Sequence, residues 1–134
     1  HKNIANLLKL KKPSYEKPFI TEKGLEDFVY EHLSELGVTP IGRQVKVKNG
    51  IVDILGEKNG KKIAIEVKLN SLSEQHLGQC LRYLKYANVA EVYLIGERID
   101  SLIKHSFEDF SIQIFTLKKH LHRSKNVFIK HRIT

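Results

Sequence analysis

The amino-acid sequence predicts an α/β domain in which helices flank a mixed central β-sheet. Short strand patterns alternate with helical patterns along the chain, and this alternation indicates parallel neighbours in the sheet. The first two strand patterns are joined by Asn49-Gly50, a dipeptide typical of tight β-hairpins, so the sheet also has antiparallel neighbours. A chain of 134 residues is long enough for one domain with its own hydrophobic core.

Two helical patterns precede the strands. Residues 3–12 form a short amphipathic pattern, which we expect to be a helix followed by a linker. A stronger pattern runs over residues 22–36, with Thr21 as the expected N-cap and Gly37 as the residue that stops the helix. Glu26 lies at the edge of its apolar stripe, which consists of Leu25, Phe28, Val29, Leu33 and Leu36.

Three strand patterns follow, at residues 43–48, 51–56 and 61–68. The second is almost wholly apolar, with Asp53 as the exception. The third alternates, so its side chains divide between the two faces of the sheet. Ile63, Ile65 and Val67 are expected on one face, and Ala64, Glu66 and Lys68 on the other.

The second half of the chain continues the alternation. Ser71 and Glu74 have the spacing of a capping box and predict a helix that ends near Ala87. Strands at 91–95 and 112–117 and a helix at 99–105 are expected next, and residues 127–133 suit an edge strand, a dimer arm or a tail that orders on DNA. In the helix after Ser71, the expected buried stripe is Leu77, Cys80, Leu81 and Leu84, and the opposite side is Gln75, Gln79, Tyr83 and Tyr86.

Composition excludes several classes of protein. Hydrophobic residues make up 41% of the chain and charged residues 28%, which argues against disorder. A single cysteine, Cys80, rules out an intramolecular disulfide and zinc sites built on paired cysteines. There is no apolar run of the ~18 residues that a membrane span needs, and no signal-peptide pattern. We therefore expect a cytoplasmic protein without a membrane partner.

The basic charge is concentrated at the two ends. The net charge is +8, of which residues 1–18 contribute +4 and residues 118–134 contribute +6, leaving −2 for residues 19–117. We expect residues 1–18 to be a basic N-terminal helix and linker, residues 19–117 to be the core domain, and residues 118–134 to be a basic C-terminal extension. Basic segments around a near-neutral core suit a polyanionic partner, although charged tails that only keep a domain soluble have the same composition.

Three charged residues occupy strand positions that suggest chemistry. Asp53 interrupts an apolar strand, where an unpaired carboxylate costs several kcal/mol. Glu66 and Lys68 lie two apart on the next strand and emerge on the same face. If these strands are neighbours, Asp53 and Glu66 converge on one cation, and hard ions such as Mg²⁺ or Mn²⁺ take such oxygen ligands. The alternative is a surface ion pair between Glu66 and Lys68, with Asp53 satisfied by a backbone N–H.

The order of these residues resembles the PD-(D/E)XK nuclease superfamily, although Val52 stands where a proline usually precedes the aspartate. Within it, the sequence resembles the C-terminal nuclease domain of archaeal NucS (EndoMS) endonucleases, and archaeal Holliday-junction resolvases more distantly. The similar motifs are Leu25–Phe28, Val52–Gly56, Glu66–Lys68 and Gln79 to Tyr83. This resemblance implies a restriction-endonuclease-like core with the element order αβββαβ.

The resemblance also implies an activity, a metal-dependent DNA endonuclease that hydrolyses phosphodiester bonds, with branched, flap, mismatch or junction DNA as candidate substrates. Asp53, Glu66 and the backbone carbonyl of Val67 would bind Mg²⁺ or Mn²⁺, and Glu26 would bind it directly or through water. Lys68 would be the catalytic lysine. Gln79 would reach toward the scissile phosphate. A catalytically inactive nucleic-acid-binding module on the same fold is the alternative.

The same family relation implies partners. DNA is the expected ligand, a homodimer is the expected assembly, and a sliding clamp or another replication or repair protein is a further candidate partner. Tyr83 and Tyr86 have rings that suit stacking on unpaired bases, although a tyrosine on the flank of a packed helix is the commoner case. The candidate DNA-binding residues are Arg43, Lys46, Lys48, Arg82, Tyr83, Lys118, Lys119 and Arg123.

Overall fold

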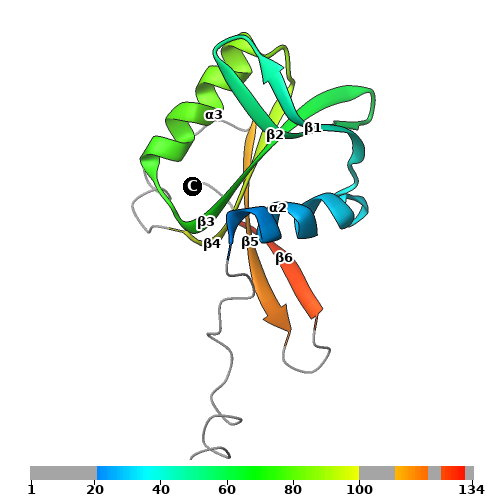
Figure 1. Ribbon diagram of the computed structural model, residues 1–134, viewed down its shortest axis with the longest axis vertical. Coiled ribbons are helices and arrows are strands. Elements are labelled where there is room, and N and C mark those ends of the chain that lie inside the picture. The colour runs from blue at the N-terminus through cyan, green and yellow to red at the C-terminus, as the bar shows by residue number, and fades with distance from the viewer. Residues whose placement is uncertain (1–20, 100–110, 121–124, 132–134) are drawn as a thin grey trace, which may run out of the picture.

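A computed structural model describes residues 21–99, 111–120 and 125–131. They form a six-stranded sheet with the strand order β1-β2-β3-β4-β5-β6. Helices α2 (Glu22–Glu31) and α3 (Glu74–Tyr86) cover opposite faces of this sheet (Figure 1). This architecture confirms the predicted α/β fold with a mixed sheet. The strands are β1 (Thr39–Val47), β2 (Gly50–Lys58), β3 (Lys61–Leu72), β4 (Glu91–Ile99), β5 (Ile112–His120) and β6 (Lys125–His131).

The sheet combines two kinds of pairing. Strands β1, β2 and β3 form an antiparallel meander, and β6 pairs antiparallel with β5. Strands β3, β4 and β5 are parallel, and α3 makes the crossover from β3 to β4. Two hydrophobic cores result, one between the sheet and α2 and one between the sheet and α3. The helix expected at residues 3–12 lies outside the described residues, as does most of the helix expected at 99–105, whose first residue instead ends β4.

Helix α2 begins where the sequence predicts. The Gly24 N–H donates to Thr21 Oγ1 over 3.0 Å, which makes Thr21 the N-cap. The α-helix ends at Glu31 rather than continuing to residue 36, and a 3₁₀ turn (Leu33–Leu36) replaces its last turn. Gly37 stops this turn in the left-handed conformation, with a φ of 73°.

Helix α3 differs from its prediction in its cap and its buried face. The N-cap is Ser73, whose N–H donates to His76 Nδ1 over 3.1 Å, so the capping box is not formed by Ser71 and Glu74. Ser71 stays in β3 because the parallel pairing with β4 continues as far as Leu72. The buried residues are Leu77, Cys80 and Tyr83, whereas Leu81, expected in the core, is 42% exposed.

The sheet continues beyond residue 117, where we expected the core domain to end. Strand β5 extends to His120, and β6 pairs with it from His131 back to Lys125. Of the three alternatives for the C-terminal segment, the structure therefore has an edge strand over Lys125–His131. No helix in the described part of the chain has both the length and the apolar character to cross a bilayer.

A glycine in β2 tests the packing between β2 and the start of β1. A Cβ at Gly56 would lie 2.3 Å from Val38 Cγ1 and 3.0 Å from the Thr39 carbonyl oxygen. We expect Gly56→Ala to lower the free energy of unfolding by about 1–3 kcal/mol, because a side chain forced into a packed core displaces its neighbours. Gly78→Ala is the control, since its Cβ would meet nothing nearer than 3.9 Å and helix propensity favours alanine by about 1 kcal/mol. Urea unfolding of both variants measures the difference, and equal stability would contradict the packing argument.

Candidate active site

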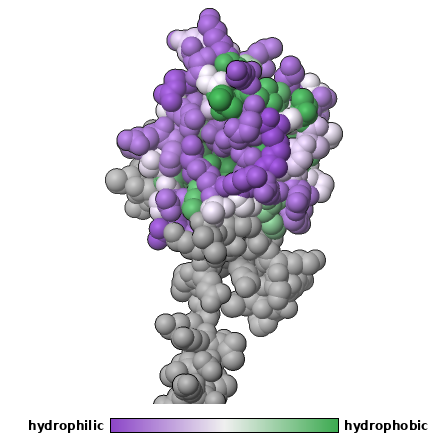
Figure 2. All heavy atoms as spheres, in the orientation of Figure 1, coloured by the Kyte–Doolittle hydropathy of each residue, from purple (hydrophilic) through white to green (hydrophobic). Residues whose placement is uncertain are grey.

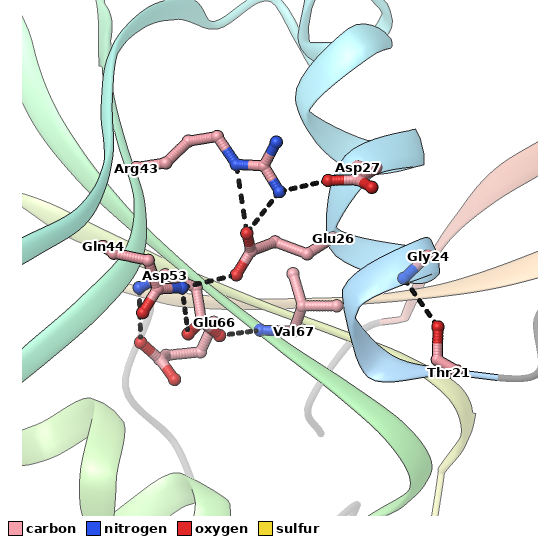
Figure 3. Close-up of polar contacts among 9 residues, drawn as sticks. All are labelled: Thr21, Gly24, Glu26, Asp27, Arg43, Gln44, Asp53, Glu66 and Val67. Atoms are coloured by element: carbon pink, nitrogen blue, oxygen red, sulfur yellow. Dashed lines mark hydrogen bonds and ion pairs between the residues drawn. The ribbon is translucent and has the colours of Figure 1, made fainter.

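The candidate site forms where β2 and β3 separate. Their antiparallel pairing runs from Lys58–Lys61 to Ile54–Ile65. At the next position, the backbone–backbone hydrogen bonds between the two strands give way to hydrogen bonds with the side chains of Asp53 and Glu66, as Figure 3 shows. The Asp53 N–H donates to Glu66 Oε1 over 3.2 Å, and the Val67 N–H donates to Asp53 Oδ2 over 2.9 Å. Each carboxylate thus binds a backbone N–H of the opposite strand.

Asp53 marks an irregularity in β2. Val52 packs in the core beneath α3, whereas Ile54, two residues later, packs in the core beneath α2. A regular strand would place both side chains on the same face. The side-chain alternation therefore breaks at Asp53, and the carboxylate points toward β3, where the Val67 N–H donates to it (Figure 3).

Glu66 is on the predicted face of β3 and is only 1% exposed. Burial, followed by the charge of Asp53, raises the pKa of Glu66 from 4.5 to about 8. The Lys68 ammonium lies 3.8 Å from Glu66 Oε2 and offsets part of this effect. The structure therefore brings together Asp53, Glu66 and Lys68 as the sequence suggested. A simple surface ion pair does not describe them, because the Glu66 carboxylate is buried.

The donor atoms fit a hard divalent cation. Asp53 and Glu66 supply carboxylate oxygens from adjacent strands, and a cation stabilises a buried carboxyl such as Glu66, whose pKa is raised by burial and by the neighbouring Asp53. In the described part of the chain, no group of three or more His, Cys, Asp or Glu side chains is arranged to hold a metal ion. This is compatible with Mg²⁺, which usually takes one or two carboxylates and completes its shell with water and substrate oxygens.

Glu26 faces the site from α2 but is held by an arginine. Its carboxylate accepts from Arg43 Nε over 3.0 Å, from Arg43 Nη2, and from Gln44 Nε2 over 2.7 Å. Arg43 also pairs with Asp27 and lies 5.0 Å above the centre of the Tyr30 ring. These two acids raise the pKa of Arg43. The guanidinium of Arg43 is thus held by two acids of α2, and its contact with DNA stays a prediction.

Gln79 and Tyr83 form a chain of hydrogen bonds that connects α3 to the start of β2. The Gln79 Nε2 donates to the Tyr83 hydroxyl over 3.0 Å, and that hydroxyl donates to the Ile51 carbonyl over 2.8 Å. Tyr83 is 3% exposed, and burial raises the pKa of its phenol, so the ring is neither free to stack on a base nor ionised. The prediction that Tyr83 contacts DNA is wrong for this reason. Gln79 contacts Tyr83 at the edge of the site.

The structure places most of the remaining residues that we expect to contact DNA. Lys46, Lys48 and Arg82 are exposed. Lys118 and Lys119 belong to β5, and Arg123 lies outside the described residues. One residue of the site was missed by sequence reasoning: Gln44, whose amide lies between Glu26 and Asp53.

Comparisons with known proteins concern the family and the fold of this chain. The family model described as the endonuclease NucS C-terminal domain matches residues 21–128. No curated protein sequence matches the chain.

Two solved structures share the fold. The crystal structure of a repair endonuclease from Pyrococcus abyssi superposes with a TM-score of 0.55 at 21% identity, covering 64% of this chain and 42% of that one. The structure of an EndoMS–double-stranded DNA complex superposes with a TM-score of 0.54 at 23% identity, covering 65% of this chain and 41% of that one. The aligned part thus spans about two fifths of each of these proteins. With the family model matching most of its length, the chain belongs to the family of endonuclease NucS C-terminal domains.

Proposed function

We propose that this domain is a metal-dependent DNA endonuclease that hydrolyses phosphodiester bonds with Mg²⁺ or Mn²⁺. The observation that carries the proposal is the meeting of Asp53 and Glu66 at the point where β2 and β3 separate, with the Lys68 ammonium 3.8 Å from Glu66. Family membership supports it, and a structural neighbour was solved with double-stranded DNA.

Each residue of the site has a role in this proposal. A bound cation supplies polarisation of the phosphate and an acidified water molecule. Asp53 and Glu66 would hold the cation together with the Val67 carbonyl, and the Val67 N–H fixes the orientation of Asp53. Lys68 presents a positive charge where negative charge builds on the phosphate, and it can orient the attacking water. The Gln79–Tyr83 pair keeps the start of β2 in place.

A basic surface beside the site suits the DNA strand. We name it the hairpin surface, and it comprises Lys46, Lys48 and Ile51 of the β1–β2 hairpin with Arg82, Lys85 and Tyr86 of α3. Residues 46–51 and 78–87 include these four basic side chains and no acidic one. Figure 1 shows the hairpin beside α3, and Figure 2 shows hydrophobic side chains among hydrophilic ones at this end of the molecule. The contact between Tyr83 and Ile51 joins the hairpin surface to the site.

Tyr86 is central to the hairpin surface. It is 38% exposed, and the ammonium groups of Lys48 and Lys85 lie 5.9 Å and 5.3 Å from the centre of its ring. Ile51 is 49% exposed. An aromatic ring flanked by lysines is the combination that binds a nucleic-acid backbone and its bases together.

The hairpin surface predicts a salt-dependent contribution to binding. We expect the double variant Lys48→Ala/Lys85→Ala to bind DNA more weakly and to lower the slope of log K against log salt by about 1.8, since each phosphate contact contributes about 0.9. The control is Lys61→Ala/Lys62→Ala, which removes the same charge from two exposed residues at the start of β3. Fluorescence anisotropy in EDTA measures both slopes. Equal slopes for the two double variants would contradict a local contact.

A cleavage panel tests the proposed activity. End-labelled single-stranded, duplex, splayed-arm, mismatched and four-way-junction DNA, and a single-stranded RNA, are incubated with Mg²⁺, Mn²⁺ or EDTA. We expect cleavage of at least one DNA with a cation and none in EDTA. If every substrate stays intact while binding remains salt-sensitive, the domain is a nucleic-acid-binding module without catalysis. Sedimentation velocity in the same conditions tests the homodimer.

A further inference from the structure

Gln44 has an unusual backbone for a residue within a strand. Its φ is 50°, in the left-handed region that side chains other than glycine, asparagine and aspartate rarely adopt. The other described non-glycine residues with positive φ are Asn49, Asn59 and Asn88, which all lie outside the strands. Backbone conformations of this kind persist where the surrounding structure enforces them, and they concentrate at functional sites.

The conformation of Gln44 changes the face that β1 presents. Arg43 reaches Glu26 on α2, whereas Val45 packs against the core beneath α3. The two residues would share a face in a regular strand. Strand β2 makes the same change at Asp53, and the register places Gln44 opposite Asp53, between the pairs Arg43–Ile54 and Val45–Val52. The two irregularities therefore coincide, and both side chains reach the site.

The Gln44 amide lies between two carboxylates. Its Nε2 donates to Glu26 Oε1 over 2.7 Å and lies 3.4 Å from Asp53 Oδ1 (Figure 3). An amide nitrogen carries two hydrogens and no net charge, so it can serve both acids without altering the charge of the site. Glu26 is fixed in turn by Arg43. Arg43, Glu26 and Gln44 thus form a continuous tether from α2 to Asp53.

We propose that Gln44 is a positioning residue that holds the Asp53 carboxylate in the orientation required for cation binding. Asp53 has two restraints in this arrangement, the Val67 N–H on Oδ2 and Gln44 on Oδ1. Glu26 then acts as the anchor of the tether, since both of its oxygens already accept hydrogen bonds from Arg43 and Gln44. The inference rests on the proposed function only in taking Asp53 as a ligand of the cation.

The variants Gln44→Met and Gln44→Gly distinguish the effect of the side-chain amide from the effect of the backbone conformation. Methionine keeps the length of the side chain without its donor, and glycine removes the side chain but adopts the left-handed conformation without strain. We expect both variants to bind Mn²⁺ about 10-fold more weakly, the effect typical of losing a residue that orients a metal ligand. The kcat for DNA cleavage should fall while KM stays near the wild-type value. Electron paramagnetic resonance of free Mn²⁺ without DNA gives the affinity.

Gln113→Met is the matched control, since it removes an amide whose Nε2 contacts the Glu91 carboxylate over 3.4 Å, away from the site. It should bind Mn²⁺ as the wild type does. Wild-type Mn²⁺ affinity in Gln44→Met would overturn the positioning role and leave the proposed endonuclease intact. A wild-type protein that neither binds Mn²⁺ nor cuts DNA would overturn both.

Discussion

Asp53→Asn is expected to lower the rate of DNA cleavage by roughly three orders of magnitude while preserving the fold and the affinity for DNA. In the wild type the Val67 N–H lies 2.9 Å from Asp53 Oδ2, and the side-chain oxygen of asparagine can accept the same hydrogen bond. The local structure where β2 and β3 separate is therefore retained. What disappears is the negative charge that would bind the cation. Single-turnover cleavage of the preferred DNA, with anisotropy in EDTA for affinity, measures the two effects separately.

Lys68→Met tests the role of the lysine in the same cleavage assay. We expect it to lower cleavage by about two to three orders of magnitude with little change in Mn²⁺ affinity, because the lysine acts on the phosphate and the water rather than on the cation. Lys62→Met, an exposed lysine of the same strand, is the control. If Lys68→Met cuts DNA at the wild-type rate, Lys68 serves only as the partner of Glu66.

The arrangement of β3 around the site could be predicted from sequence because the strand is regular from Ile63 to Lys68. Alternation alone placed Ile65 and Val67 in one core and Glu66 toward the other face, and the structure agrees. Asp53 was conspicuous because it was the only charge in an apolar strand. Both patterns can be seen within a single strand, so they predict the positions of these side chains without knowledge of how the strands pair.

Gln44 could not be found in this way because its place depends on strand register. A turn centred on Asn49-Gly50 would place Lys46 opposite Asp53. The chain instead turns at Lys48-Asn49, and Val47 pairs with Gly50, which puts Gln44 opposite Asp53. The left-handed backbone of Gln44 then separates Arg43 from the face of Val45. Two local departures from regular geometry therefore decide which side chains meet Glu26.

Tyr83 shows a similar dependence on tertiary contacts. A helical stripe of leucines predicts Leu81 in the core, yet Leu81 is exposed and Tyr83 is buried. The hairpin explains the difference, since the Tyr83 hydroxyl donates to the Ile51 carbonyl and its ring lies against Gly50. The partner of the Tyr83 hydroxyl can be predicted only once the position of the neighbouring hairpin is known.

Glu66→Gln is expected to stabilise the metal-free protein at alkaline pH while abolishing cleavage. The pKa of Glu66 is raised from 4.5 to about 8 in the folded state, so folding favours the protonated carboxyl. Its contribution to stability is complete below about pH 4.5, is lost progressively as the pH rises toward 8, and is absent above that. Glutamine has no proton to lose, so the variant should exceed the wild type by on the order of 5 kcal/mol above pH 8.

Urea unfolding in EDTA at about pH 5, 7 and 9 follows this difference through the titration window. Glu57→Gln, which neutralises an exposed acid on β2, should show no such pH-dependent gain. A constant difference between Glu66→Gln and the wild type at all three pH values would show that the carboxyl stays ionised in the folded protein, contrary to its burial.

The same destabilising carboxylate is what a cation would bind, and this connects stability with function. In the wild type at pH 9, added Mn²⁺ should recover stability by about 2.7 kcal/mol at a concentration 100 times its Kd, because it binds only the folded state. Glu66→Gln should gain little, since one of its two carboxylate ligands is gone. A stable, inactive variant that no longer responds to Mn²⁺ would mean that Glu66 is retained for cation binding at the expense of the metal-free fold. Equal responses to Mn²⁺ would remove Glu66 from the cation site.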